Sequence, residues 1–347
     1  MPTTVLVTGV STYLGAGVAR ALAASEGVER VVGVDVMAPE FPLGEAEFLR
    51  SDARNPLLGR VVRQAGIDTL VHVPEPSAAT GRSARVAARE AMVIGTMQLL
   101  GVCQAVPQLR HVVLASTGSV YGSSASSPAV VTEQTPTTTL ARGGHVRDAI
   151  EVESYVRAVA RRRSEVGISI LRLTHLFGRH SHSAMTNYLR APVVPVPLGF
   201  DARIQALHED DAVDVLVAAA SGEPVDTLNV AGDGVVTLRQ LLRLAHRPSV
   251  PVLTTTGRAL GRLARWAGIA GVEPDHIDYV MFGRCLDTSR MCDVLGFVPR
   301  MTTRETVQWY ARETWGVVPS RPASDLARPE TPRLTVVPDL PRREEGR

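Results

Sequence analysis

Two glycines and an aspartate near the N-terminus have a spacing that suits the binding of an adenine dinucleotide. Gly9 follows an apolar, β-branched run that ends at Thr8, Gly15 comes six residues later, and Asp35 ends a second apolar run. A glycine turn between a buried strand and a helix sets a pyrophosphate on the helix N-terminus, and an acid after the next strand accepts hydrogen bonds from ribose hydroxyls. The pattern predicts such a site, with a simple tight turn between strand and helix as the alternative.

The phosphate loop departs from the usual glycine motif at one position. Thr12 stands where the middle glycine belongs, and Tyr13 and Leu14 complete the predicted loop. A side chain at Thr12 is expected to crowd the phosphates, although its hydroxyl can donate to a phosphate oxygen. Asp35 favours NAD over NADP because a carboxylate repels a 2′-phosphate. The alternative for Asp35 is an ordinary acid in solvent at the end of a strand.

Strand-like and helix-like segments alternate along the first half of the chain and predict the elements that position these residues. We expect further strands at 46–49, 68–73, 111–116 and 169–173, and helices at 14–24, 56–65, 82–106 and 145–165. Repeated βα units with buried strands imply a parallel sheet covered by helices on both faces. The expected fold is α/β, a doubly wound Rossmann-type sheet followed by a smaller C-terminal ligand-binding domain.

Composition narrows the functional class. The 347 residues are 45% hydrophobic and carry a net charge of +2, which argues against a nucleic-acid or membrane partner. No apolar run approaches the ~20 residues of a membrane span, and the three cysteines have no metal spacing, so we expect a cytoplasmic protein with reduced thiols. All 37 basic residues are arginine; the chain contains no lysine.

Several segments resemble the motifs of a known family and follow one another in that family's order. They are HVVLASTGSVYG at 111–122, ILRLTHLFG at 170–178, ALHEDDAVDVL at 206–216, TLNVAGDG at 227–234 and LGFVPR at 295–300. With the first βαβ unit, the chain resembles the extended short-chain dehydrogenases, specifically the NAD-dependent epimerase/dehydratase group that includes the UDP-galactose epimerases. The resemblance implies NAD as cofactor, a nucleotide-sugar-like ligand, a homodimer, and cofactor contacts from Asp52 and Ala53.

The same resemblance places the catalytic positions. Thr117 matches the family's catalytic Ser or Thr, with a capping role for its hydroxyl as the alternative. The Tyr-x-x-x-Lys motif, however, has become His145 and Ala149. In the family the lysine charge favours the phenolate of a tyrosine whose ordinary pKa is about 10, and it also holds the nicotinamide ribose. Without either residue we expect lost or strongly reduced redox catalysis.

An active enzyme is the competing hypothesis. An imidazole titrates near pH ~6.5 without help, so His145 together with Thr117 can serve as an acid–base pair in a nucleotide-sugar epimerase, dehydratase or reductase. The other interpretation of His145 is a helix N-terminal residue in solvent or in a capping contact. Further departures count against ordinary epimerase chemistry: Met92 replaces an asparagine, Pro74-Glu75-Pro76 replaces an alanine-rich turn, and His175 replaces a second asparagine.

The second half of the chain is less informative. By resemblance, His175, Arg203 and Gln205 are candidate substrate contacts, and Arg284 is a candidate for gripping a diphosphate or for a surface ion pair. The histidines lack zinc spacing, so no metal is expected. Acids at 209–211 are expected to cap a helix at 212–220. We divide the chain into a dinucleotide-binding domain at 1–175, a smaller domain at 176–316 with some strand exchange, and a disordered Pro/Arg-rich tail at 317–347.

Overall fold

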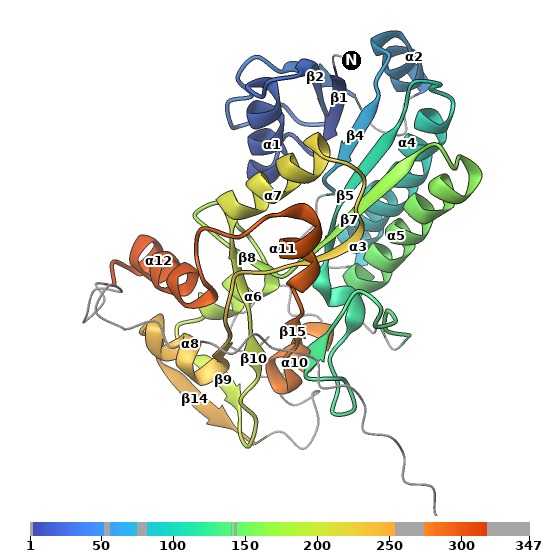
Figure 1. The fold of residues 1–347 in the computed structure, drawn as a ribbon. Helices are drawn as coiled ribbons and strands as arrows, with labels where there is room; N and C mark the ends of the chain where they lie inside the picture. Colours follow the sequence, from blue (N-terminus) through green and yellow to red (C-terminus); the bar gives the residue numbers. More distant parts are fainter. Residues whose placement is uncertain are drawn as a thin grey trace, which may run out of the picture.

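A seven-stranded parallel sheet forms the centre of the protein (Figure 1). The computed structural model describes residues 3–51, 56–74, 82–139, 141, 144–253 and 274–317. The sheet order is β12-β7-β5-β4-β1-β2-β3, and every neighbouring pair is parallel. The strands are β1 (Thr3–Thr8), β2 (Val28–Asp35), β3 (Glu47–Arg50), β4 (Thr69–His72), β5 (His111–Thr117), β7 (Gly167–Leu173) and β12 (Asp226–Val230).

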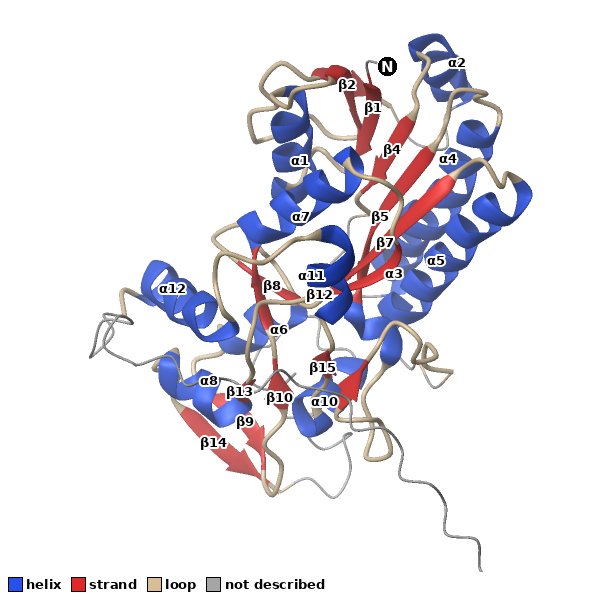
Figure 2. Ribbon diagram, viewed as in Figure 1, coloured by secondary structure: helices blue, strands red, loops and turns tan. Residues whose placement is uncertain are grey.

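Helices cover both faces of this sheet, as the alternating pattern predicted (Figure 2). On one face, α1 (Tyr13–Ala23) packs against α7 (Glu209–Ser221), and Val5 and Val7 join their apolar core. On the other face, α2 (Pro56–Ala65), α4 (Gly95–Gln104) and α5 (Gly144–Arg162) pack over Leu6 and its neighbours. Successive strand residues point to opposite faces, so two helical layers bury the continuous apolar runs on both sides.

The single helix expected over 82–106 is interrupted. It comprises α3 (Arg82–Arg89), a π-helical turn at Glu90–Ile94, and α4. Within this stretch, the Thr96 hydroxyl donates to the Met92 carbonyl and bonds to the ring of buried His72. Side-chain bonds to a helix carbonyl compete with the regular ladder, and π-turns often mark such positions.

A smaller lobe follows the sheet in sequence and lies at the lower left of Figure 1. It contains the third apolar core, centred on Phe177, Tyr188 and Tyr310. Its elements are β8 (His175–Phe177), α6 (Ala184–Leu189), β9 (Val194–Pro197), β10 (Arg203–Ile204), β11 (Ala206–His208), β13 (Val236–Thr237), α8 (Leu238–Leu244), β14 (Ser249–Val252), α10 (Pro274–Phe282) and α12 (Thr303–Trp315). The short pair β6 (Val130–Val131) and β15 (Cys285–Leu286) joins it to the segment after β5.

The chain returns from the smaller lobe to the large sheet twice. Residues 209–230 supply α7 and the edge strand β12, and α11 (Ser289–Leu295) packs beside β12. The expectation that the acids at 209–211 cap α7 is wrong. His208 is the N-cap, and its Nδ1 accepts from the Asp210 amide at 3.2 Å, because the acids themselves lie within the first helical turn.

Candidate functional site

The two motif glycines are required by close backbone approach. Gly9 has φ +76°, and a Cβ there would lie 2.2 Å from the carbonyl oxygen of Val73. A Cβ on Gly15 would lie 2.1 Å from the carbonyl oxygen of Gly9. Any larger residue would push the first turn of α1 away from the ends of β1 and β4. The glycines therefore set the loop that the sequence assigned to a pyrophosphate.

Thr12 is turned into the loop rather than toward a ligand. Its hydroxyl donates to the Gly9 carbonyl at 2.7 Å and accepts from the Gly15 amide at 3.1 Å, as the N-cap of α1. The hydroxyl proton is therefore already used, and a donation to phosphate would require giving up the bond to Gly9. The amides of Tyr13 and Leu14, in the first turn of the helix, have no intrahelical carbonyl partner and remain suited to an anion.

Asp35 lies beside this loop at the end of β2. One carboxylate oxygen accepts from the Ser11 amide at 2.9 Å, and the other accepts from the amides of Val36 and Met37 at 2.7 and 3.3 Å. The carboxylate is thus oriented by backbone donors from both the glycine loop and the turn after β2. A strand-end acid merely facing solvent would not link the two segments, so the geometry supports the ribose-binding interpretation.

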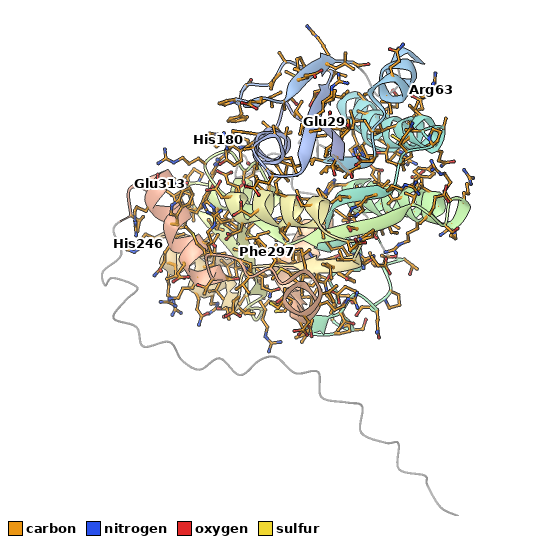
Figure 3. All side chains as sticks on the ribbon, turned by 45° about the horizontal axis from the view of Figure 1, so that its top comes forward. Glu29, Arg63, His180, His246, Phe297 and Glu313 are labelled. Atoms are coloured by element: carbon orange, nitrogen blue, oxygen red, sulfur yellow. The ribbon has the colours of Figure 1, made fainter. Side chains whose placement is uncertain are left out.

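An aromatic cluster closes the outer side of the loop. The Tyr13 ring stacks on His180 with centroids 4.7 Å apart, and Phe41 meets both rings edge-on. The Tyr13 hydroxyl donates to Asp210 at 2.5 Å, and burial together with this carboxylate raises its pKa. His180 is labelled in Figure 3 beside α1. The phosphate loop is thereby tied to α7 and to the segment after β8.

Below the loop, buried polar groups join the ends of β1 and β4. The Thr8 hydroxyl bonds to Nδ1 of His72 at 2.7 Å, and Nε2 of the same ring bonds to Thr96 at 2.8 Å. Burial lowers the pKa of His72 to about 4, so the ring is neutral near pH 7. Met92, which replaces the expected asparagine, is buried beneath this network and offers it only a backbone carbonyl.

Two of the expected cofactor contacts, Asp52 and Ala53, lie outside the described residues. So do Glu75 and Pro76, which replace part of the family's alanine-rich turn. The predicted tail is likewise outside the described part from residue 318 onward. The glycine loop and Asp35 are the part of the expected cofactor site that the structure describes.

Thr117 lies half-buried at the end of β5, where active residues of open α/β sheets gather. Its hydroxyl accepts from the Ser119 amide at 3.2 Å and caps the short 3-10 turn Gly118–Tyr121. The capping alternative is thus part of its role. Beside it, the Ser116 hydroxyl donates to Glu153, whose carboxylate pairs with Arg172 at 2.6 Å. This buried pair fixes the end of β5 against α5.

His145 lies in the first turn of α5, half-buried rather than free in solvent. Burial and the Arg85 guanidinium lower its pKa, while Asp148 opposes them. Ala149, which holds the family's lysine position, is buried in the core beneath α5. Arg147, on the same turn, is exposed and donates to the Ala141 carbonyl. The family's amine therefore has no counterpart at residue 149.

A cluster of buried polar and aromatic side chains lies between β8 and α10, in the smaller lobe. The ring of His175 lies 4.5 Å from that of Tyr279 and 6.4 Å from that of His276. The buried Nε2 atoms of both histidines and the Tyr279 hydroxyl have no hydrogen-bond partner among the described residues. Buried polar atoms are rarely left unpaired, so these three atoms suit a polar ligand or ordered water. Burial, His276 and Arg284 hold the pKa of His175 well below its usual range.

Arg284 places a positive charge beside this cluster. Its guanidinium lies 5.1 Å from the Tyr279 ring centroid and donates to the Gly122 carbonyl and the Ser123 hydroxyl at 2.9 and 3.3 Å. These partners are neutral, and burial lowers its pKa. A partly desolvated cation with no salt bridge in the described part of the chain is suited to an anionic ligand. Among the described residues, the ion pair that sequence left open for Arg284 is not seen.

Two other candidate substrate contacts lie nearby, and they differ in exposure and in hydrogen bonding. Arg203 is exposed on β10, and its carbonyl accepts from the Arg284 amide. Gln205 is buried, and its carboxamide bonds both the amide and the carbonyl of Leu286, at 2.7 and 3.3 Å. Gln205 therefore already has a structural role, whereas the Arg203 side chain makes no hydrogen bond or salt bridge with the residues that the structure describes.

Sequence reasoning missed His276, Tyr279 and Arg85. His276 and Tyr279 are three residues apart, a spacing that puts both on one side of a helix, but nothing local connects α10 with His175. Arg85 carried no motif at all. Within the described ranges, no group of three or more His, Cys, Asp or Glu side chains could hold a metal ion.

Comparisons with known proteins agree with this architecture. The model of the NAD dependent epimerase/dehydratase family matches residues 5–231. The chain is 38% identical over 315 residues to Rv0501, an uncharacterized protein of Mycobacterium tuberculosis (strain ATCC 25618 / H37Rv), covering 90% of this chain and 84% of the relative. It is 27% identical over 330 residues to y4nG, an uncharacterized protein of Sinorhizobium fredii, covering 88% and 78%.

Solved structures share the fold at lower identity. MoeE5, in complex with UDP-glucuronic acid and NAD, has a TM-score of 0.68 and 21% identity, covering 89% of this chain and 98% of its own. UDP-glucose-4-epimerase from Stenotrophomonas maltophila, with bound NAD and formylated UDP-arabinopyranose, has a TM-score of 0.68 and 18% identity, covering 90% and 98%.

Proposed function

Since the chain belongs to the NAD-dependent epimerase/dehydratase family, we propose that it binds NAD at the glycine loop, with little or no redox turnover. The observation that carries the proposal is the pre-formed loop. Gly9 and Gly15 permit the close turn, Thr12 caps it from within, and Asp35 is held beside it by backbone donors. NAD would supply hydride transfer when bound; the chain's own groups bind and orient its phosphates and ribose.

NAD is preferred over NADP on electrostatic grounds. The Asp35 carboxylate is oriented at the end of β2 and is suited to accept from a ribose diol, and it would repel a 2′-phosphate. Solved structures with the same fold include MoeE5 in complex with NAD. Calorimetric titration of the full chain with NAD and NADP tests the proposal directly. Equal affinity for both dinucleotides, or no binding of either, would overturn it.

The second ligand we propose is a nucleotide-sugar-like molecule beside Arg284. Its half-buried guanidinium, bonded only to neutral groups among the described residues, suits a diphosphate, and the unpaired ring nitrogens of His175 and His276 suit hydroxyl groups. MoeE5, which shares the fold, has been solved in complex with UDP-glucuronic acid and with UDP-glucose. Titration with UDP and with UDP-sugars, in the wild type and in Arg284→Gln, tests this assignment.

Reduced catalysis follows from the chemistry of two positions. Ala149 has no amine, and the chain has no lysine that another segment could bring to the site. General acid–base groups typically contribute about 10²- to 10⁴-fold in rate. We expect turnover of UDP- and dTDP-sugars to be absent or far below ~1 s⁻¹, the lower end of ordinary enzymes. A rate at or above that value would overturn the proposal.

An active nucleotide-sugar epimerase, dehydratase or reductase is the second candidate, and one observation favours it. His145 is half-buried with its pKa lowered by burial, so a neutral imidazole is available near pH 7 at the family's tyrosine position. Thr117 lies at the end of β5, on the segment that packs against α5. Measurable turnover that is lost in both His145→Gln and Thr117→Val would decide for this candidate.

We further propose a homodimer through the outer face of α3, α4 and the π-helical turn between them. Val86, Ile94 and Met97 are exposed there. By length and composition alone, the helical stretch Arg85–Gln104 could cross a membrane. In the fold, 39% of its most apolar 18-residue segment is buried. A second copy covering this face would bury the apolar side chains. We also propose a cytoplasmic location, because three cysteines, few and odd in number and without a metal spacing, suit a reducing compartment.

A further inference from the structure

Arg85 brings a fixed positive charge to the first turn of α5, where the family's lysine is missing. It reaches across from α3, and its Nη2 lies 2.5 Å from Oδ2 of Asp148. The Asp148 side chain is only 1% exposed, whereas the arginine remains partly open to solvent. A buried carboxylate of this kind is stable as an anion only with its cation in place. Arg85 is therefore the counter-charge of this buried side chain.

Gly144 lets the guanidinium lie directly against the helix. A Cβ on Gly144 would come within 2.0 Å of Nη2 of Arg85 and 2.4 Å of its Cζ. The arginine thus contacts residues 144 and 148, which lie on either side of His145 along the same helical turn. Its position is set by packing as well as by charge.

Helix stability alone does not explain this arrangement. The N-terminal end of a helix carries partial positive charge, so an arginine there is unfavourable. In addition, Oδ1 of Asp148 is buried and has no hydrogen-bond partner among the described residues. Leaving such an atom unpaired costs about 1–3 kcal/mol. Oδ1 can therefore accept a hydrogen bond from a suitable donor.

The ring of His145 is a candidate donor by its position in the helix. Residues three apart on a helix share a side, so His145 and Asp148 are neighbours. The groups that face His145 come from four elements: Asp148 on α5, Arg85 on α3, Asp275 on α10 and His175 on β8. The two carboxylates favour its protonated form, while Arg85 and burial favour the neutral one.

We propose that Arg85 and Asp148 are positioning residues for His145, with Arg85 in place of the missing lysine as the fixed cation of this site. Arg85 orients Asp148 through Oδ2, and Oδ1 receives the N–H of His145 when the ring is protonated. Only the assumption that a ligand binds near His145 rests on the proposed function. The pair itself is a property of the unliganded chain, so it is tested without ligand.

The test is the titration of His145 in the full-length protein, followed by NMR of ring-labelled histidine. The chain has nine histidines, and the signal missing in His145→Gln identifies residue 145. Arg85→Gln should raise the pKa of His145 and Asp148→Asn should lower it, each by roughly half a unit or more. Arg85→Lys, which retains the charge, should restore most of the wild-type value.

Two glycine variants test whether the position of the Arg85 guanidinium, rather than a general disturbance of the fold, sets the pKa of His145. Gly144→Ala keeps every charge but displaces the guanidinium, so it should move the pKa of His145 in the direction of Arg85→Gln. Gly101→Ala, on a helix with nothing within 4 Å of its Cβ, should leave it unchanged. Circular dichroism shows whether Arg85→Gln and Asp148→Asn fold. If either does not, the pKa of His145 in Gly144→Ala, compared with that in Gly101→Ala, tests the inference instead.

An unchanged pKa of His145 in the folded Arg85 and Gly144 variants overturns the inference, as does a shift of the same sign in Arg85→Gln and Asp148→Asn. NAD titration of the same samples distinguishes the two proposals. A wild type that binds no NAD but shows the opposite shifts would reject the dinucleotide function and retain the positioning pair.

Discussion

The Asp35 carboxylate is shared between the protein's own backbone and the ribose that we assign to it. Three amides already bond to it, from Ser11, Val36 and Met37. A carboxylate has about four acceptor directions, so room remains for one ribose hydroxyl without loss of these bonds. The residue therefore links the shape of the loop to the choice of cofactor.

Asp35→Ala should weaken NAD binding about ten- to a hundredfold, because a hydrogen bond to a charged group contributes about 1.5–3 kcal/mol. The preference for NAD over NADP should shrink at the same time. Glu29→Ala is the matched control, since this exposed acid lies at the other end of the same strand and is labelled in Figure 3. Calorimetry on both variants measures the effect, and equal losses in the two would argue against a ribose contact.

Restoring the family's pair as His145→Tyr with Ala149→Lys should create at most a modest activity. Thr12, Pro74 and Met92 would still shape the cofactor site, and Ala149 is packed in the core, where a lysine needs space and a counter-charge. The assay is turnover of UDP-glucose, with each single variant as control. Turnover at an ordinary enzymatic rate would show that the loss is confined to two side chains.

At the scale of elements, the first turn of α1 depends on a contact that no side chain can replace. Gly15→Ala would place a Cβ against the Gly9 carbonyl, and overpacking of this kind costs about 1–3 kcal/mol. We expect a lower urea midpoint and loss of NAD binding. Gly101→Ala, in an open helical position, should be neutral or slightly stabilising. Similar urea midpoints for the two variants would contradict the argument.

The outer face of α3 and α4 gives a second prediction at this scale. Met97→Glu should convert a dimer into a monomer at micromolar concentration, because a charge would face the apolar side chains of the second copy. Val298→Glu, an exposed apolar residue elsewhere, is the control. Analytical ultracentrifugation of the wild type and both variants measures the mass of the particle in solution. A wild type that is monomeric would remove the proposal.

The sequence predicted the sheet well because its information is local. Buried strands such as Val5–Val7 and the run before Ser116 are continuous apolar segments, and their glycine turns have fixed spacing. The helical turn at 90–94 was missed because it results from a tertiary bond between Thr96 and His72. Arg85 and His276 escaped notice for the same reason, since each acquires meaning only from a neighbour far along the chain.

For the whole molecule, buried histidines make stability depend on pH. Burial lowers the pKa of His72, His111 and His276 to about 4, whereas the unfolded chain titrates near 6.5. The unfolded state thus binds more protons between these values. Stability should be full above pH 6.5 and fall toward pH 4, by up to about 1.4 kcal/mol per pH unit for each such site.

His276→Phe checks this at one site. The ring packs among aromatic neighbours, including Tyr188 with centroids 5.5 Å apart, and its Nε2 has no partner, so phenylalanine should keep the packing. The variant should match the wild type at pH 8 and lose less stability at pH 5. Urea unfolding at the two pH values gives the comparison, and parallel losses would contradict it.

The chain's return from the smaller lobe to the large sheet makes the two halves mechanically inseparable. α7 packs against α1 so closely that a Cβ on Gly17 would lie 2.8 Å from a methyl group of Val213, and β12 completes the hydrogen-bonding edge of β7. A fragment ending at residue 175 would lack both and expose the apolar faces they cover. The molecule should therefore melt in one cooperative transition, and a ligand bound at either lobe should raise the melting temperature of the whole chain.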